Sequence, residues 1–334
     1  MKALVLEEVK QPLQLRERPD PAPGPGEVVV SLEAASLNRR DFWITQGLYP
    51  GLRIPVVPGS DGAGVVSATG EGVEGDLAGR DVLINPSMNW GDDPGAQGGD
   101  FEVLGMPADG TFATHLVTTP GQLLPRPAHL SAREAATLPI AALTAWRVLF
   151  TQGKLQAGQK VLITGIGGGV ALFCAQFALA AGAEVFATSS SEEKIDRVVE
   201  MGASAGANYR DDDWAKEFRA RHGQVHLIVD GAGGKDYGRL LDIALAAGRI
   251  VNYGSTAGAP ERLDLFRLFW KQLRIIGSTM GTADEMVAML EFITSHQLHP
   301  VIDSTYALAD GNAALDCMKN HRQFVKLVLD CSDT

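Results

Sequence analysis

The stretch Leu162–Phe173 reads LITGIGGGVALF, in which an apolar strand pattern runs through a cluster of glycines into an apolar helix pattern. Such a turn needs glycines where the backbone approaches a pyrophosphate without a Cβ in the way. The helix, which begins near Val170, offers free N–H groups and the positive end of its dipole to an anion. We predict a dinucleotide-binding turn here, and a purely structural turn is the alternative. Its glycines are Gly165, Gly167, Gly168 and Gly169.

Strand and helix patterns alternate around this turn, which predicts a parallel, doubly wound sheet. One helix pattern has Ser190 and Glu193 at capping-box spacing and ends at Gly202. Upstream, AREAATLPIAALTAWRVLF is helical apart from Pro139, which should break or kink the helix. The downstream patterns are strand AEVFATS, helix SSEEKIDRVVEMGA, strand HLIVD, helix YGRLLDIALAAG, and strands RIVNYG and LRIIGSTM.

The two ends of the chain have a different character. Up to about Pro125, short β-branched and apolar segments lie between glycines and prolines, which predicts an antiparallel β domain. Residues 282–334 contain one clear helix, ADEMVAMLEFITSH, and a short strand, FVKLVLD. This segment is too small for a domain of its own, so we expect it to return to the first one. The expected domains are 1–124 with 281–334, and 125–280.

Composition excludes several classes of function. The formal net charge of −11 is unsuited to binding nucleic acid, which needs concentrated Lys and Arg. No apolar stretch is long enough to span a bilayer, and the opening MKALVLEEVKQP is not a signal peptide, so a cytoplasmic location is expected. Cys174, Cys317 and Cys331 are far apart, which argues against a disulfide framework and a Cys-rich zinc site.

The end of the second strand bears on which dinucleotide binds. An NAD site usually carries Asp or Glu there, on the ribose hydroxyls. Here the position reads Thr188, Ser189, Ser190, and Lys194 follows one helical turn later. Hydroxyls and an ammonium suit a 2′-phosphate, so we expect NADP(H). The alternative is that Lys194 is simply a solvated helix residue.

The glycine string, together with SSSEEK, the NYR at Asn208–Arg210 and GRIVNYG, resembles the medium-chain dehydrogenase/reductase superfamily over essentially the whole chain. The resemblance implies a GroES-like β-rich catalytic domain into which a Rossmann domain is inserted. In the zinc-dependent members, Cys and His ligands stand where this chain has Asn38 and Ser60. No cysteine lies near Leu138–Thr144 or in the lobe Asn85–Gly110. We therefore expect neither a catalytic nor a structural zinc site.

LNRRDFWITQGLYP is similar to the quinone oxidoreductase branch of this superfamily. The resemblance implies that Asn38, Asp41 and Tyr49 lie near the nicotinamide and the substrate. It also implies that Ser190, Lys194 and Tyr209 contact the 2′-phosphate. The other positions assigned to the cofactor are Thr144, Val170, Ser189, Gly231 and Gly254.

Without zinc, activated acceptors are the reasonable substrates: quinones and α,β-unsaturated carbonyl compounds. Hydride addition to them gives an anion that hydrogen-bond donors stabilise. Asn38 and Tyr49 are the candidate donors, with Tyr49 or a water as proton source. The alternatives are that Asn38 caps a turn, that Asp41 orients a short helix, that Tyr49 only packs in its loop, and that Arg39 and Arg40 are a solvated pair.

Two other functions stay open. An enoyl-thioester reductase would need a basic patch, which could come from arginines in the first domain. A non-enzymatic NADPH-binding protein would bind the cofactor without hydride transfer. We also expect a homodimer through an edge strand at Leu273–Met280, as is common among the zinc-free members. The arginines are Arg16, Arg18, Arg39, Arg40 and Arg53.

Overall fold

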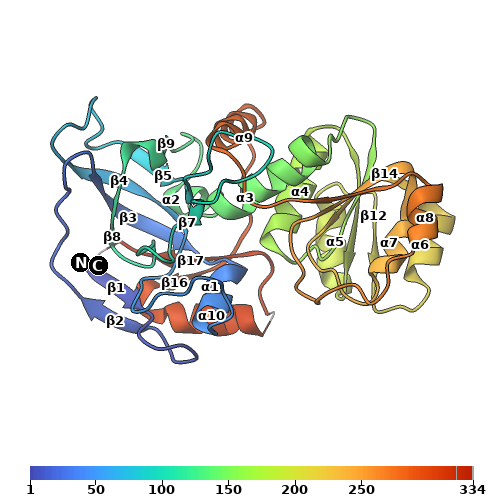
Figure 1. Cartoon of the computed structure of the whole chain (residues 1–334), viewed down its shortest axis with the longest axis horizontal. Coiled ribbons are helices and arrows are strands. Elements are labelled where there is room, and N and C mark those ends of the chain that lie inside the picture. The colour runs from blue at the N-terminus through green and yellow to red at the C-terminus, as the bar shows by residue number, and fades with distance from the viewer. Residues whose placement is uncertain (321, 333–334) are drawn as a thin grey trace. The chain divides into compact units, whose positions relative to one another are not determined.

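The computed structural model describes residues 1–320 and 322–332, and the chain divides into two compact units (Figure 1). Unit 1 comprises Met1–Ala141 and Gly281–Thr334, and unit 2 comprises Ala142–Met280. The first boundary falls later in the chain than the expected 124/125. The reason is that β9 (Leu123–Pro125) still pairs with a strand of unit 1, and α2 (Ala132–Ala135) packs on the same sheet.

Unit 1 is built on a seven-stranded sheet with the strand order β16-β17-β3-β4-β5-β9, and β8 also pairs with β3. All of its pairings are antiparallel except the parallel pair β16 and β17. The C-terminal segment therefore adds two strands to the first domain, as expected. The strands are β3 (Val28–Ser36), β4 (Asp61–Thr69), β5 (Asp81–Ile84), β8 (His115–Thr118), β9, β16 (Ile302–Ala307) and β17 (Lys326–Asp330).

Smaller elements complete unit 1. The hairpin of β1 (Lys2–Val5) and β2 (Gln14–Glu17) and the pair β6 (Ser87–Met88) and β7 (Glu102–Val103) lie outside the main sheet. Buried apolar side chains of β1, β3, β17 and α10 form one core. The helices are α1 (Arg39–Thr45), α2, α9 (Ala283–Ser295) and α10 (Gly311–Lys319), with the 3₁₀ turns Pro120–Gln122 and Leu308–Asp310. The sequence analysis identified neither β16 nor α10.

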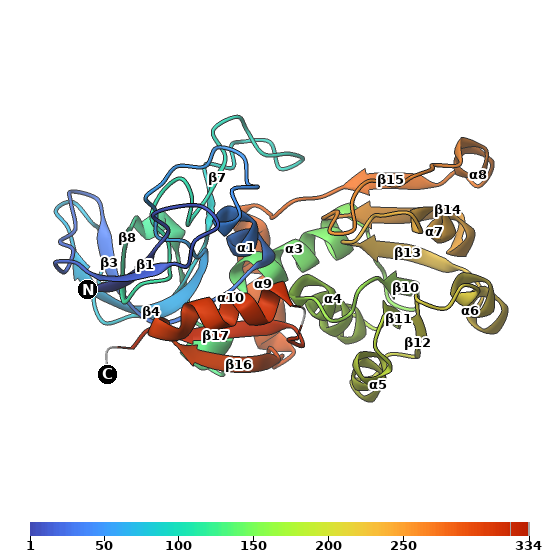
Figure 2. The same cartoon turned by 90° about the horizontal axis from the view of Figure 1, so that it is seen from below.

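Unit 2 is a six-stranded sheet in the order β12-β11-β10-β13-β14-β15, with every pair parallel. Figure 2 shows the strands stacked in this order. In chain order this is 3-2-1-4-5-6, the doubly wound arrangement of dinucleotide-binding domains, which confirms the predicted fold class. The strands are β10 (Lys160–Ile163), β11 (Glu184–Ser189), β12 (Ala205–Asn208), β13 (Val225–Asp230), β14 (Ala244–Asn252) and β15 (Arg274–Gly277).

The helices of unit 2 follow the predicted alternation. The helical segment that leads into this unit is divided at Pro139, as predicted. α2 ends at Ala135 and α3 begins at Pro139, where the missing N–H is tolerated. A π-helical turn, Arg147–Gln152, continues α3 (Pro139–Trp146). The other helices are α4 (Gly169–Ala180), α5 (Glu192–Glu200), α6 (Trp214–His222), α7 (Tyr237–Ile243) and α8 (Leu265–Trp270).

Two local predictions in unit 2 were wrong. The helix predicted over YGRLLDIALAAG ends at Ile243, and Ala244 begins β14. The Lys271 ammonium donates to the carbonyls of Leu241, Asp242 and Ala244, which satisfies acceptors that a longer helix would have used. The cap of α5 is also shifted by one residue.

The N-cap of α5 is Ser191 rather than Ser190, and its Oγ accepts from the Lys194 N–H at 3.4 Å. Ser190 and Glu193 therefore do not form the predicted capping box. Since any of several adjacent serines can cap a helix, spacing alone could not choose among them. The shift leaves the Ser190 hydroxyl outside the helix cap.

Candidate active site

The glycine turn follows β10 and opens α4, as predicted. Gly165 has a φ of +66°, which suits glycine, and Gly168 is the N-cap of α4. The turn is fastened to the end of β11, because the Ile166 N–H donates to the Thr188 carbonyl at 2.9 Å. The first N–H groups of α4, from Gly169 and Val170 onward, lack intrahelical acceptors. This arrangement fits the phosphates of a dinucleotide.

Lys194 lies over the glycine turn. Its Nζ and Cδ are both 2.9 Å from the place that a Cβ on Gly167 would occupy. The ammonium thus lies directly beside the turn, and a side chain at position 167 would displace it. Ser189 is buried and accepts from the Ser191 N–H, Ser190 is partly exposed, and Tyr209 is 42% exposed.

Ser189 and Tyr209 are also joined through the backbone, since the Tyr209 N–H donates to the Ser189 carbonyl at 3.0 Å. The structure therefore gathers four of the predicted residues, Gly167, Ser189, Lys194 and Tyr209, at the ends of β10, β11 and β12. No carboxylate stands at the end of β11, where an NAD site usually has one. Glu192 instead accepts from the Asn208 side chain at 2.7 Å.

Asp230 organises the neighbouring loop at the end of β13. Its Oδ1 accepts from the Thr164 hydroxyl at 2.6 Å, and its Oδ2 accepts from Gly233 N at 2.8 Å and Asn252 Nδ2 at 2.9 Å. Asn252 in turn accepts from the Tyr237 hydroxyl at 2.6 Å. Burial raises the pKa of Asp230, against the opposing effect of these hydrogen bonds. The network ties the glycine turn to the loops after β13 and β14.

The remaining residues assigned to the cofactor are closely packed. A Cβ on Gly231 would lie 2.4 Å from Cζ of Tyr253, and one on Gly254 would lie 3.0 Å from the Gly231 carbonyl oxygen. Close packing explains both glycines, and a cofactor contact stays a prediction for them. Thr144, on α3, is 6% exposed, and within the described residues no hydrogen bond links it to the glycine turn.

A buried polar cluster lies in unit 1 at the end of β3. Ser36, the last residue of β3, pairs with Asp61 at the start of β4 and with Val328 of β17, two residues after Lys326. Asn38 Nδ2 donates to Asp61 Oδ2 at 2.8 Å, and Lys326 Nζ donates to Asn38 Oδ1 at 2.9 Å. Lys326 Nζ also lies 3.1 Å from Asp61 Oδ2 and donates to the Leu37 carbonyl at 3.0 Å. The exposed fractions of the Lys326 and Asp61 side chains are 4% and 0%.

Asp61 is the centre of this cluster. Its other oxygen, Oδ1, accepts from the Ile140 N–H at the start of α3 at 2.8 Å. Burial raises the pKa of Asp61, and the Lys326 ammonium acts in the opposite direction. A buried carboxylate with an ammonium beside it is a charge pair in a region of low dielectric, where electrostatic interactions are strong.

The two other residues predicted to be catalytic are placed differently. Asp41 Oδ2 accepts from the Asn38 N–H at 2.7 Å at the start of α1, and Asp41 is fully buried. This is the geometry of a residue that orients a short helix. Tyr49 packs on the core of unit 1, and the Arg40 guanidinium lies 4.9 Å from its ring centroid. Arg40 also donates to the Ser60 hydroxyl and, at 2.8 Å, to the Leu104 carbonyl.

The residues at this position do not fit a catalytic zinc ion. Tetrahedral zinc takes Cys, His or carboxylate ligands, but here Asn38 and Ser60 stand beside Asp61. The amide oxygen of Asn38 and the carboxylate of Asp61 both face the Lys326 ammonium, which would repel a metal cation. Within residues 1–320 and 322–332, no group of three or more His, Cys, Asp or Glu side chains is placed to hold a metal.

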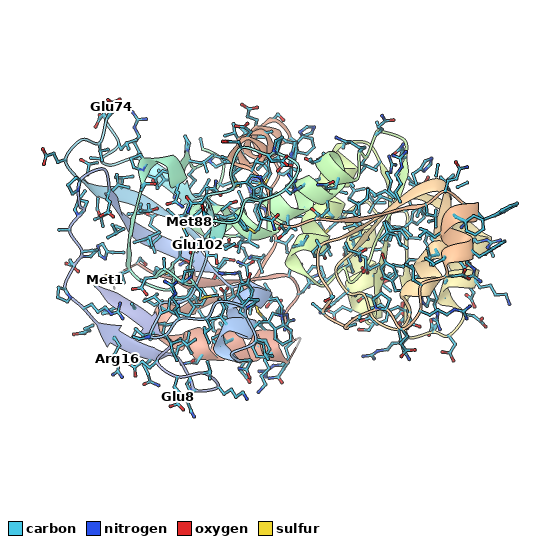
Figure 3. All side chains as sticks on the ribbon, in the orientation of Figure 1. Met1, Glu8, Arg16, Glu74, Met88 and Glu102 are labelled. Atoms are coloured by element: carbon cyan, nitrogen blue, oxygen red, sulfur yellow. The ribbon has the colours of Figure 1, made fainter. Side chains whose placement is uncertain are left out.

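Four of the five arginines considered for a basic patch have hydrogen-bond or ion-pair partners within unit 1. Arg16, on the β1–β2 hairpin, is paired with Glu7 at 2.8 Å and lies at the outer edge of unit 1 (Figure 3). Arg18 is paired with Asp109 at 3.1 Å. Arg39 donates to the Met318 carbonyl at 3.0 Å, whereas Arg40 is held at Ser60 and Leu104. Most of these side chains therefore have their own partners in the folded unit.

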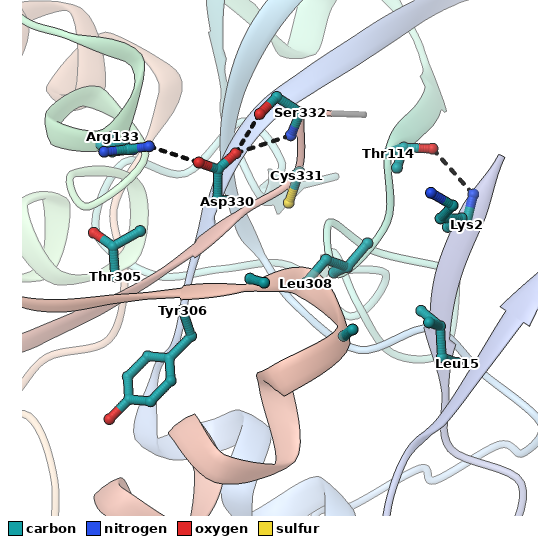
Figure 4. Close-up of a pocket in the computed structure, with 12 residues that line it drawn as sticks. Lys2, Leu15, Thr114, Arg133, Thr305, Tyr306, Leu308, Asp330, Cys331 and Ser332 are labelled. Atoms are coloured by element: carbon teal, nitrogen blue, oxygen red, sulfur yellow. Dashed lines mark hydrogen bonds and ion pairs between the residues drawn. The ribbon is translucent and has the colours of Figure 1, made fainter. Parts of the chain in front are cut away.

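A pocket of about 510 Å³ lies elsewhere in unit 1 and is lined by none of the predicted site residues (Figure 4). The Arg133 guanidinium crosses one side of it to Asp330 Oδ2 at 2.6 Å. Its other walls come from β1, β16 and the segment after Asp330. Since its charged groups are already paired, we do not assign it to the reaction.

Two residues of the buried cluster were missed in the sequence. The sequence assigned no role to Asp61 or to Lys326. The signal for Lys326 was present, because a lysine between Val325 and Leu327 in a predicted strand is an ionisable group among apolar ones. Its partners come from residues 37–38 and 61, so no local pattern could have identified them.

Comparison with known proteins agrees with this architecture. Residues 24–128 match the family model described as alcohol dehydrogenase GroES-like domain, and residues 169–295 match the one described as zinc-binding dehydrogenase. The protein named zinc-type alcohol dehydrogenase-like protein YogA, from Leptosphaeria maculans, is 35% identical over 97% of this chain and 96% of its own length. An acryloyl-coenzyme A reductase from Sulfurisphaera tokodaii is 28% identical over 98% of this chain and 99% of its own.

Among solved structures, one described as an NAD-dependent alcohol dehydrogenase superposes with a TM-score of 0.94 at 34% identity, covering 99% of this chain and 100% of that one. The chain belongs to the medium-chain dehydrogenase/reductase superfamily of oxidoreductases, which confirms the resemblance found in the sequence. No helix within the described residues is both long enough and apolar enough to cross a membrane.

Proposed function

We propose that this protein is a zinc-independent, NADPH-dependent reductase of activated acceptors, namely quinones or α,β-unsaturated carbonyl compounds. The observation that carries the proposal is the cluster of Asn38, Asp61 and Lys326, in which an internal ammonium contacts Asn38, the residue that stands where zinc-dependent members have a Cys ligand. Without a Lewis acid, an unactivated ketone or alcohol is a poor substrate. An acceptor that already withdraws electrons needs only hydrogen-bond donors.

The cofactor side of the proposal rests on unit 2. Bound NADPH supplies the hydride. The glycine turn and the first turn of α4 suit its pyrophosphate, and the Lys194 ammonium beside Gly167 suits a further phosphate group. Ser190, outside the α5 cap, and the exposed Tyr209 supply hydroxyls at the same strand ends. The absence of a carboxylate at the end of β11 favours NADPH over NADH.

The acceptor side rests on unit 1. Asn38 has an amide N–H that can donate to the oxygen of the reduced acceptor, and Tyr49 or a water supplies the proton. Asp41 does not act as a base in this scheme. Its carboxylate is fully buried and accepts from the Asn38 N–H, so it positions Asn38 instead.

An enoyl-thioester reductase is the second candidate. The likeness to an acryloyl-coenzyme A reductase over nearly the full length of both chains favours it. The pairing of Arg16 and Arg18 with carboxylates and of Arg39 with a carbonyl argues against a dedicated site for the coenzyme phosphates. The chemistry at Asn38 would be the same, because an enoyl thioester is also an activated acceptor.

The test follows the loss of NADPH absorbance, with NADH in parallel, against quinones, enones and enoyl thioesters. We expect turnover with NADPH, little with NADH, and a higher kcat/KM for free quinones or enones than for thioesters. Turnover only with thioesters would establish the second candidate. NADPH binding without turnover of any acceptor would contradict both and indicate a non-enzymatic protein.

We also propose that the protein is a homodimer formed through β15. This strand is the last in its sheet, so its outer edge is unpaired within the chain. Beside it in sequence, α8 exposes Phe266, Phe269 and Trp270 by 61%, 62% and 70%. A second copy would extend the sheet and cover these rings. Light scattering should give a dimer for the natural protein and a monomer for Trp270→Lys, and a monomeric natural protein would contradict the proposal.

A further inference from the structure

Each N–H donor of the Lys326 ammonium has a hydrogen-bond acceptor. It has three N–H donors, and three acceptors lie within 3.1 Å: the Leu37 carbonyl, Asn38 Oδ1 and Asp61 Oδ2. The side chain is 4% exposed, so water does not replace these partners. A buried ammonium in such a place is unfavourable unless it is paired, and Asp61 provides the charge.

The ammonium fixes which way the Asn38 amide faces. Its Oδ1 accepts from Lys326, and a flipped amide would direct an NH₂ group at a cation. Nδ2 gives one hydrogen to Asp61 at 2.8 Å. Its second hydrogen has no acceptor among the described residues, although Asn38 is only 8% exposed. The cluster thus leaves one oriented N–H donor.

The ammonium also changes the strength of that donor. A cation bound to the amide oxygen draws electron density from the amide nitrogen, and hydrogen bonds in a chain strengthen one another. A donor fixed in direction before the reaction needs no reorganisation when negative charge develops. The Lys326–Asp61 pair has no net charge, so it does not repel an anionic product.

We propose that Lys326 is a positioning residue that orients and polarises the Asn38 amide to bind the oxyanion formed when the acceptor is reduced. This inference rests on the proposed function for its substrate. Its structural part concerns an oxyanion-binding N–H and can be measured without hydride transfer. Lys326 acts through Asn38 and does not itself touch the acceptor.

The test uses a variant in which both charges are removed together, Lys326→Met with Asp61→Asn, because the single lysine change would leave a buried unpaired carboxylate. The matched control is Lys271→Met. Lys271, the C-cap of α8 in unit 2, also donates to three acceptors, the carbonyls of Leu241, Asp242 and Ala244 at the end of α7. Asn38→Ala is the reference for complete loss of the donor.

Two readouts are taken on each protein: kcat and KM for the best acceptor, and the pKa of bound 4-nitrophenol, whose phenol and phenolate forms absorb differently. We expect the double variant to lose about tenfold to hundredfold in kcat, with the KM for NADPH unchanged. We also expect the natural protein to lower the pKa of the bound phenol, and the double variant and Asn38→Ala to lose that effect. Lys271→Met should keep both properties.

The outcomes separate the two proposals. If the natural protein reduces an acceptor but the folded double variant matches it in kcat and in phenol pKa, the role of Lys326 is overturned and the proposed function stands. If no acceptor is reduced but the phenol pKa depends on Lys326, the proposed function fails and the oxyanion site stands. If the natural protein leaves the phenol pKa unchanged, the inference is overturned whatever the activity. If Lys271→Met lost as much kcat as the double variant, the loss would reflect a general structural effect, and the positioning role of Lys326 would also be overturned.

Discussion

Asp61 in unit 1 and Asp230 in unit 2 are both buried at the end of a strand, and burial raises the pKa of both carboxyl groups. Their partners differ. Asp61 faces an ammonium 3.1 Å away, whereas Asp230 is held by a hydroxyl, a backbone N–H and a side-chain amide. The difference indicates what each carboxylate does. Neutral donors suffice to hold Asp230 and the loops around the cofactor site. The charged pair of Asp61 and Lys326 lies beside an N–H donor of Asn38, and we assign that pair to the reduction of the acceptor.

From the difference between Asp61 and Asp230, we expect the largest change in stability for Lys326→Met. This change leaves the Asp61 carboxylate buried without its cation, so we expect the free energy of unfolding to fall by about 3–5 kcal/mol. Urea denaturation measures it, and the double variant with Asp61→Asn should recover most of the loss. Equal stability of the single and double variants would show that Asp61 does not depend on the ammonium.

The next effect concerns Asp41, whose pKa burial raises from 3.8 to about 6. Between these pH values the folded protein binds more protons than the unfolded chain, so stability falls as pH rises. The loss through this window is about 3 kcal/mol at about 1.4 kcal/mol per pKa unit. In Asp41→Asn this contribution should vanish, so that the variant becomes more stable relative to the natural protein as pH rises from 4 to 7. Parallel stability curves for the two proteins would contradict the assignment.

A smaller effect is expected in unit 2. Asp230→Ala leaves the Thr164 hydroxyl, the Gly233 N–H and the Asn252 amide without their acceptor. We expect a loss of about 2 kcal/mol in unfolding free energy, together with weaker NADPH binding. Asp236→Ala is the matched control, because Asp236 is half exposed and forms an ion pair with Arg239 at 3.3 Å. Equal effects of the two changes would show that the network has no special role.

The smallest effect tests the cofactor site itself. Lys194→Ala should weaken NADPH binding about tenfold and leave NADH binding unchanged, since only NADPH carries the 2′-phosphate. Fluorescence titration with both dinucleotides measures this, with the exposed Lys216→Ala as control. An equal loss for NADH would place Lys194 at the pyrophosphate instead.

Much of the fold follows from local patterns. The glycine turn after β10, the alternation that gives a parallel sheet and the break at Pro139 all depend on residues close together in the chain. α10 and β16 were not identified, because the short helix Gly311–Lys319 packs against α1 and the core of unit 1, and the strand Ile302–Ala307 is formed by its pairing with β17. The end of α7 was misplaced because Lys271, far along the chain, satisfies its last carbonyls.

The candidate site divides in the same way. Gly167, Ser189 and Lys194 were found from the glycine turn and the end of the second strand, since strand ends of a parallel sheet meet at one edge. Tyr209 came only from the resemblance to the superfamily. The partners of Asn38 could not be found, since Asp61 and Lys326 reach it only through the pairing of β4 and β17 with β3. Spacing reveals a site formed by consecutive elements, whereas a buried ion pair between distant strands needs the structure.

The central claim is that an internal ammonium serves where a metal ion would otherwise be needed. Its most direct test is the zinc content of the purified protein, measured by mass spectrometry beside NADPH turnover with and without a chelator. We predict no stoichiometric zinc and full turnover in the presence of the chelator. One zinc ion per chain, with turnover lost on its removal and restored by its return, would contradict the account.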